Sequence, residues 1–166
     1  MKKIIFITVI LSALLLGCKE NKHTNENTKG TEKTNSVPKQ NTKKVNIKTT
    51  AMNNAWVNEI KLDDVSKWQA NLETTQGVAK MLDLIKSSNP KTLEDYHSLA
   101  SKLNEEKNFI VKECTMKGAS HDNLHIFLLP LVEKIEALSN TSALGQATIL
   151  TYRIEENLKG YYNYFQ

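Results

Sequence analysis

The sequence predicts an all-α fold, an antiparallel four-helix bundle formed by residues 51–166. Apolar residues recur there at alternating spacings of three and four in four successive segments, which is the period of an amphipathic helix. Short connections separate these segments, as is typical of antiparallel neighbours in an up-down-up-down bundle. Only residues 55–62 (AWVNEIKL) could be extended, and that stretch could equally lead into the first helix.

The first helix is expected to begin near Asp63 and Asp64, because carboxylates favour a helix N-terminus. It should end before Pro90, which cannot continue a helix. The residues expected on its buried stripe are Val65, Trp68, Leu72, Thr75, Ala79 and Leu82.

The second helix should start at Thr92, where Asp95 three residues later completes an approximate capping box. Gly118 suits a left-handed residue at the end of this helix. Its expected buried stripe is Tyr96, Leu99, Leu103, Ile110 and Cys114.

The third helix should open near Ser120 and contain Pro130, and the fourth should begin at Thr141 or Ser142. The third presents His121, Leu124, Leu128, Leu131, Ile135 and Leu138 on one face. The fourth has the most regular stripe, namely Leu144, Ala147, Thr151, Ile154, Leu158, Tyr161 and Phe165.

The N-terminus has the parts of an export signal in order. Lys2 and Lys3 precede an apolar run over residues 4–16, which is too short for a comfortable bilayer span. The run closes on Leu15-Leu16-Gly17-Cys18, which resembles the lipobox of bacterial lipoproteins. The resemblance implies that residues 1–17 are a signal peptide and that cleavage leaves Cys18 triacylated, with palmitate-type chains. Several acyl chains anchor a protein stably, so we expect a cell-envelope lipoprotein on the outer or inner membrane, facing the periplasm or the cell surface. The alternative is an ordinary secretory signal with a chance cysteine.

Residues 18–50 are rich in Lys, Asn and Thr, and so poor in apolar residues that we expect a disordered spacer. Residues 19–50 carry a formal charge of +5 and could also favour anionic head groups. The whole chain carries a formal charge of +4, whereas residues 51–166 carry −3. The excess positive charge therefore lies in the N-terminal residues 1–50. A nucleic-acid partner is therefore not expected.

The stretch CTMKGASHDNLH, residues 114–125, gathers four possible metal ligands in the turn between the second and third helices. His121 and His125 are spaced i, i+4, which places both imidazoles on one helix face. Cys114 and Met116 precede them and can add a thiolate and a thioether. This donor set is soft to borderline, so copper is favoured, Cu(I) especially, and zinc is possible without Met116.

Residues around this turn should orient the ligands. Asp122 can hold an imidazole or replace a ligand, and antiparallel packing should bring Trp68 and Asn71 to the same end of the bundle. The C-terminal GYYNYFQ reaches this end too, with Tyr161 and Phe165 in the core and Tyr162 and Tyr164 either sealing the bundle end or contacting a partner. Haem is the less favoured cofactor, because no C-x-x-C-H occurs.

Cys114 has no partner within the chain if Cys18 carries the lipid, so it should be buried, liganded or paired with another chain. The leading hypothesis is a metal buffer, chaperone or sensor at the envelope. The alternative is a non-enzymatic interaction module that docks another envelope protein without metal. An enzyme with a Cys114–His121 nucleophile ranks third, since no known catalytic signature accompanies the pair.

Overall fold

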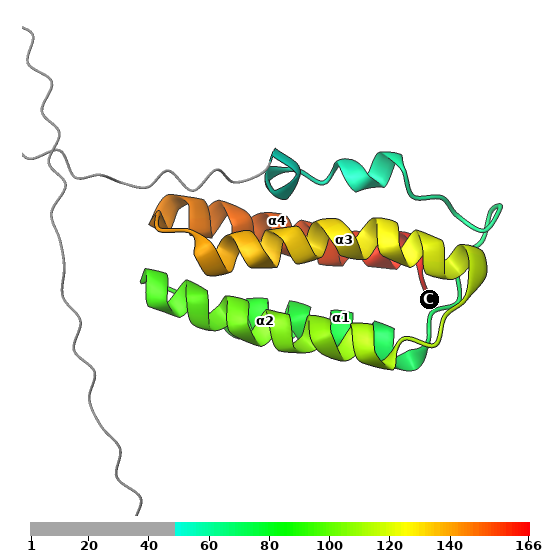
Figure 1. Cartoon of the computed structure of the whole chain (residues 1–166), viewed down its shortest axis with the longest axis horizontal. Coiled ribbons are helices and arrows are strands. Elements are labelled where there is room, and N and C mark those ends of the chain that lie inside the picture. Colours follow the sequence, from blue (N-terminus) through cyan, green and yellow to red (C-terminus); the bar gives the residue numbers. More distant parts are fainter. Residues whose placement is uncertain (1–48) are drawn as a thin grey trace, which may run out of the picture. The chain divides into compact units, whose positions relative to one another are not determined.

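The computed structural model describes residues 49–166, which form the all-α four-helix bundle expected from the sequence (Figure 1). The helices are α1 (Leu72–Ser87), α2 (Leu93–Glu113), α3 (Gly118–Asn140) and α4 (Leu144–Tyr164). Two short 3-10 helices, η1 (Thr49–Met52) and η2 (Ala55–Asn58), precede them. The predicted signal peptide, the lipidation site Cys18 and nearly all of the linker lie outside the described residues. None of the helices within residues 49–166 combines the length and the apolar character that a membrane crossing requires.

The helices form a ring in which each one packs on its sequence neighbour and α1 closes the ring against α4. At 1.5 Å per residue, the longest helix, α3, spans about 35 Å. The core between the helices is continuous and includes completely buried side chains from every helix, among them Met81, Leu103, Leu131, Ile154 and Tyr161. This packing is the physical reason that the three-four spacing of apolar residues predicted the helices correctly.

The capping box of α2 is confirmed. Thr92 Oγ1 accepts a hydrogen bond from the Asp95 amide at 3.2 Å, and Asp95 Oδ2 accepts one from the Thr92 amide at 2.9 Å. The amides of Lys91 and Thr92, which both donate to Asp95 Oδ2, lower the pKa of the Asp95 carboxyl. Gly118 has the expected left-handed conformation, with φ of 60°, but it is the first residue of α3. The second helix, α2, ends five residues earlier at Glu113, and Cys114 is its extended cap.

The predicted start of the first helix is wrong by nine residues, because α1 begins at Leu72. Asp63 and Ser66 instead close a tight turn through two backbone hydrogen bonds of 2.9–3.0 Å, with Asp64 at φ 53°. Val65 stands at the tip of this turn and is 95% exposed. Aspartates favour turns as well as helix starts, so the same residues fit either interpretation. In the fourth helix, likewise, the stripe begins at Ala147, because Leu144 is exposed.

Residues 49–71 form an N-terminal strap that runs along the bundle over α3 and α4 before it turns into α1 (Figure 1). AWVNEIKL is therefore helical in its first half, and it buries Trp56 and Ile60. The Trp56 ring packs edge-on against Phe127 of α3 and Tyr164 of α4, with ring centroids 5.5 and 5.8 Å apart. An added Cβ at Gly160 would lie 2.8 Å from the Trp56 ring, so this close approach depends on a glycine in α4.

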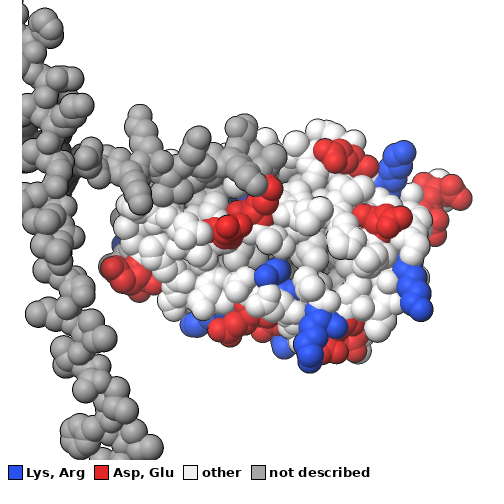
Figure 2. All heavy atoms as spheres, viewed as in Figure 1, with Lys and Arg blue, Asp and Glu red and all other residues white. Residues whose placement is uncertain are grey.

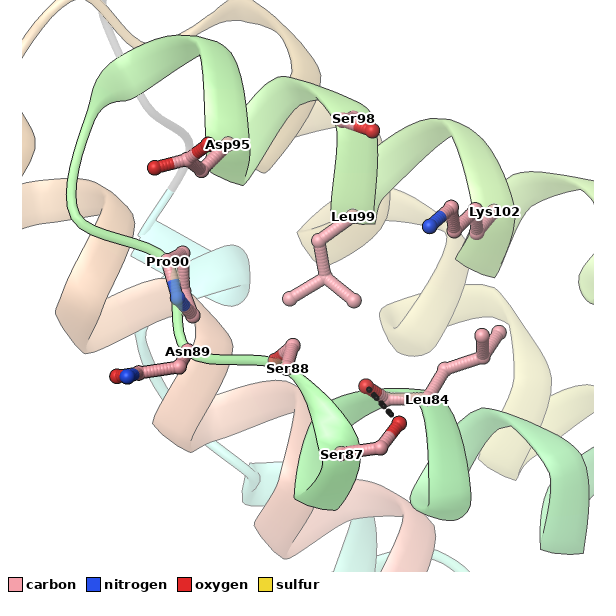
Figure 3. Close-up of a pocket in the computed structure, with 9 residues that line it drawn as sticks. All are labelled: Leu84, Ser87, Ser88, Asn89, Pro90, Asp95, Ser98, Leu99 and Lys102. Atoms are coloured by element: carbon pink, nitrogen blue, oxygen red, sulfur yellow. Dashed lines mark hydrogen bonds between the residues drawn. The ribbon is translucent and has the colours of Figure 1, made fainter.

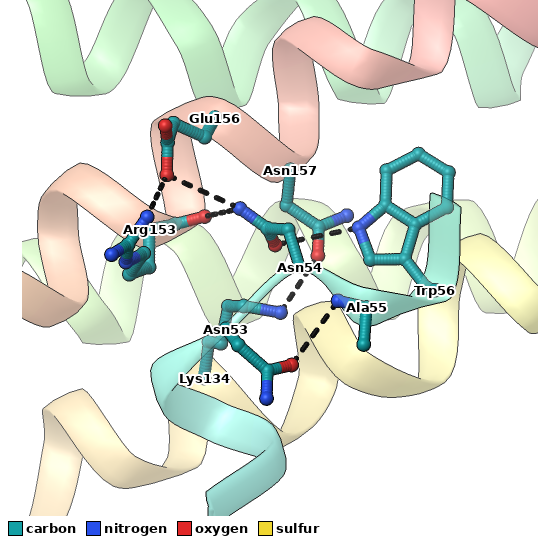
Figure 4. Close-up of polar contacts among 8 residues, drawn as sticks. All are labelled: Asn53, Asn54, Ala55, Trp56, Lys134, Arg153, Glu156 and Asn157. Carbon is teal, nitrogen blue, oxygen red and sulfur yellow. Dashed lines mark hydrogen bonds and ion pairs between the residues drawn. The ribbon is translucent and has the colours of Figure 1, made fainter. Parts of the chain in front are cut away.

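The strap is also held by polar contacts to α4 (Figure 4). Asn54 Nδ2 donates to the Arg153 carbonyl at 3.3 Å and to Glu156 Oε2 at 3.4 Å, and Asn54 Oδ1 accepts from Trp56 Nε1. Glu156 in turn pairs with the Arg153 guanidinium at 2.7 Å, which lowers the pKa of the Glu156 carboxyl. These bonds join residues about a hundred positions apart, so the strap is part of the folded domain.

Candidate functional site

The stretch with the four predicted metal ligands is the α2–α3 corner, as the topology implied. Cys114 caps α2, Met116 lies in the connection, and His121 and His125 lie in the first two turns of α3. Cys114, Met116 and His121 are half-buried, whereas His125 is exposed. Both sulfur side chains pack against the core.

Three of the four predicted ligands line one pocket. Cys114 from α2 and His121 and His125 from α3 surround a cavity of about 150 Å³. The rest of its lining is aliphatic, from Ile110, Val111, Leu124 and Leu128. Met116 does not line this cavity, so the structure unites the thiol with the two imidazoles and leaves the thioether apart.

The two imidazoles contact each other directly. Their ring centroids are 4.5 Å apart with an interplanar angle of 87°, as expected for histidines one turn apart on a helix. Within residues 49–166, however, no three His, Cys, Asp or Glu side chains come close enough together to hold a metal ion. The corner thus offers a pair of nitrogen donors with a thiol beside them in the same cavity, not a complete set of three.

The residues expected around the ligands have different roles. Asn71 does reach the corner, where its Nδ2 donates to the Glu113 carbonyl at 3.1 Å and so joins the start of α1 to the end of α2. Its second bond, to Glu73 Oε2, lowers the pKa of the Glu73 carboxyl. Asp122 is exposed. None of the hydrogen bonds found within residues 49–166 joins Asp122, Trp68 or Asn71 to an imidazole.

Trp68 instead ties the strap to the C-terminus. Its amide donates to the Tyr164 carbonyl at 2.8 Å, its carbonyl accepts from the Gln166 amide at 3.0 Å, and its indole donates to the Lys61 carbonyl. Tyr161 and Phe165 are buried with stacked rings, and Tyr162 remains 37% exposed. The tyrosine-rich end therefore mainly seals the bundle.

Tyr161 buries its phenol completely in the core at this end of the bundle. Its hydroxyl is 2.9 Å from Thr75 Oγ1, and burial raises its pKa to about 12, with smaller contributions in the same direction from Tyr162 and Cys114. A neutral, hydrogen-bonded phenol is not a base at physiological pH. Tyr161 therefore does not supply a base to this corner.

Sequence reasoning missed a buried polar pair on α3 and α4. Lys134 and Asn157 are both completely buried, and Lys134 Nζ donates to Asn157 Oδ1 at 2.9 Å and to the Pro130 carbonyl at 3.3 Å (Figure 4). Burial lowers the pKa of Lys134 to about 8. The signal was present in the sequence, because each residue directly precedes an apolar stripe position of its helix, Ile135 or Leu158.

A polar hollow of about 250 Å³ lies at the α1–α2 connection (Figure 3). Part of its polar lining serves the backbone: Ser87 Oγ donates to the Asp83 and Leu84 carbonyls, Ser88 Oγ donates to the Ile85 carbonyl, and Asp95 caps α2. Asn89, Ser98 and Lys102 line the hollow as well.

Comparisons of the chain with protein-family models, with curated proteins and with solved structures find no match. The chemistry of the residues themselves therefore carries the functional proposal.

Proposed function

We propose that this chain is a lipid-anchored envelope protein whose helical domain takes up one soft metal ion, Cu(I) in preference to Zn(II), at the α2–α3 corner. The observation that carries the proposal is the shared cavity, which Cys114, His121 and His125 all line. The lipobox-like Leu15–Cys18 supports the anchoring, and the expected export places the domain where copper and zinc are handled.

The incomplete donor set favours Cu(I) over Zn(II). Structural zinc takes four ligands in a tetrahedron, and the described residues bring no three carboxylate, imidazole or thiol side chains together. Cu(I) accepts two or three donors and prefers soft ones. The imidazoles of His121 and His125 supply the pair, and rotation of the Cys114 side chain into the cavity supplies a thiolate.

The aliphatic lining suits this role. The walls from Ile110, Leu124 and Leu128 offer water no hydrogen-bond partner on that side of the ion, which disfavours the additional water ligands that a harder, more highly charged ion retains. Such a site fits a buffer, chaperone or sensor, because these roles require only that the ion be held and released.

The test is an anaerobic titration of a soluble form, residues 19–166, with Cu(I) in competition with a chelator, and separately with Zn(II). We expect one Cu(I) per chain, retained in the matched control His23→Ala and lost in the double variant His121→Ala/His125→Ala. Affinity for Cu(I) should fall at least about tenfold in Cys114→Ser if the thiolate binds. Absence of stoichiometric uptake, or uptake unchanged in the double variant, refutes the metal proposal.

The second candidate is a tethered interaction module without metal. It is favoured by Leu129, which is 61% exposed and lines a largely apolar hollow between the strap and α3, because exposed apolar surface of this kind marks interaction sites. Capture of partners from membranes with and without added metal separates the two candidates, since only the first predicts metal dependence.

A further inference from the structure

We infer that the groove between the N-terminal strap and α3 docks a basic, amphipathic segment of a partner protein. This strap–α3 groove is a hollow of about 340 Å³ whose apolar lining comes from Trp56, Ile126, Leu129 and Pro130 and whose acidic lining comes from Glu59 and Glu133. The inference goes beyond metal binding and gives the second candidate function a surface and a partner chemistry.

The floor of the groove is apolar and accessible. Leu129 is 61% exposed although it lies between the buried residues Leu128 and Leu131. Ile126 and Pro130, which are half-buried, line the hollow with it, as does the largely buried Trp56. When an apolar group of another molecule covers an exposed leucine side chain next to a hollow, the free energy of the system falls.

The charge around the groove has one sign. Glu59 and Glu133 line it, and no Lys or Arg of residues 49–166 does. On α3 the other charged residues are Asp122, Glu136 and Lys134, and Lys134 is completely buried, so the exposed charges of this helix are all negative. Figure 2 shows red carboxylate atoms flanking a stretch of uncharged surface over α3. Residues 51–166 carry −3 in total.

Charge complementarity therefore selects the occupant. A segment with apolar residues on one face and Lys or Arg on the other covers Leu129 and Ile126 while its cations approach Glu59 and the negative surface of α3. An anionic lipid surface has the wrong sign for this face. The chain's own residues 19–48 are basic but contain only Val37, Val45 and Ile47 as large apolar residues, too few for one apolar face.

The probe is a helical peptide with leucines on one face and lysines on the other, and the control peptide has glutamates in place of the lysines. Both are titrated into residues 19–166 with a chelator present, because His125 lines the groove and the metal cavity alike. Backbone amide shifts measured by NMR report the site. We expect the lysine peptide to shift amides of the strap and α3, and the glutamate peptide to leave them unchanged.

Two exposed residues give matched variants. Leu129→Lys should weaken binding of the lysine peptide about tenfold, as loss of a central apolar contact does. Ile149→Lys, at a 46% exposed position on α4 away from the groove, should leave the affinity within about twofold. Equal weakening by both variants, shifts that map elsewhere, or no binding overturns the inference.

Two further outcomes assign the groove to another occupant and also overturn it. One is binding that appears only after the lysines of residues 19–48 are replaced by glutamine, which means that the chain's own tail fills the groove. The other is a concentration-dependent dimer that Leu129→Lys abolishes, which means that a second copy does. Every peptide titration is done without metal, so its outcome does not test the Cu(I) proposal. In the same way, a failed Cu(I) titration does not test whether the groove binds a peptide.

Discussion

Replacing Lys134 by methionine tests what it costs the domain to hold an ammonium group inside the bundle. The hydrogen-bond acceptors of this completely buried side chain are neutral, the Asn157 side chain and the Pro130 carbonyl. Burial lowers its pKa from the usual 10.5 to about 8, with the Arg153 charge acting in the same direction and Glu133 opposing it. The difference corresponds to about 3 kcal/mol of unfavourable free energy when the group is protonated in the folded state.

The sign of the pH dependence follows from the lowered pKa. Below pH 8 the lysine is protonated in the folded and unfolded states alike, and the full cost is present. Between about pH 8 and 10.5 the unfolded chain keeps a proton that the folded chain has lost, so the free energy of unfolding rises with pH. The rise between about pH 7 and pH 10 should amount to about 2 kcal/mol. The Tyr161 phenol, with its pKa of about 12, acts in the opposite direction only above pH 10.

The assay is urea unfolding followed by circular dichroism at several pH values between 7 and 10. The Lys134→Met variant loses the cost of the buried charge but leaves Asn157 Oδ1 without its donor, a penalty of about 1–3 kcal/mol. Near pH 7 the two effects offset each other, and the variant should be about as stable as the parent. Near pH 10 it should be less stable than the parent by about 2 kcal/mol.

The difference between the two pH slopes isolates the lysine, because every other titrating group is common to both proteins. Lys102→Met, at an exposed position on α2, is the control and should keep the parent slope. Parallel pH profiles for the parent and Lys134→Met contradict the reasoning, since they mean that the ammonium reaches water in the folded state.

Two local features of the fold give further predictions. Gly160→Ala should destabilise the domain by about 1–3 kcal/mol, because its Cβ meets the Trp56 ring at 2.8–2.9 Å, whereas Gly145→Ala, with open space around it, should be neutral or slightly stabilising. Chemical denaturation compares the two, and equal effects argue that the strap can shift away from α4. Thr92→Ala should cost about 1 kcal/mol by removing the acceptor for the Asp95 amide. Faster amide hydrogen exchange confined to the first turn of α2 would accompany this loss, and unchanged stability contradicts the role of the cap.

The bundle was predictable because its helices are encoded by local spacing. Pro130 lies inside α3, and the Thr92 cap begins α2, as the sequence indicated. The strap was not predictable in the same way, because residues 49–71 owe their conformation to distant partners, such as Gly160 for Trp56 and the C-terminus for Trp68. The apparent helix start at Asp63 failed for this reason: the spacing of Val65 and Trp68 imitates a helix stripe, yet their neighbours in space are unrelated to it.

The α2–α3 corner shows where sequence reasoning about a site ends. Topology alone places Cys114, His121 and His125 at one turn, and the shared cavity agrees with that prediction. Whether they form a ligand set depends on the direction of the Cys114 side chain, which is set by the extended backbone at this cap and by packing against the core. The spacing of residues in the sequence indicates neither this backbone conformation nor this packing. In the metal-free domain, the free energy is lower when the Cys114 thiol packs against the leucines. In the metal-bound domain, the thiol would turn towards the imidazoles and bind the ion. Binding of Cu(I) through all three donors therefore has to offset the loss of the Cys114 packing. Affinity for Cu(I) should therefore rise when Leu124→Ala loosens that packing, and an affinity that stays unchanged or falls contradicts this account of Cys114.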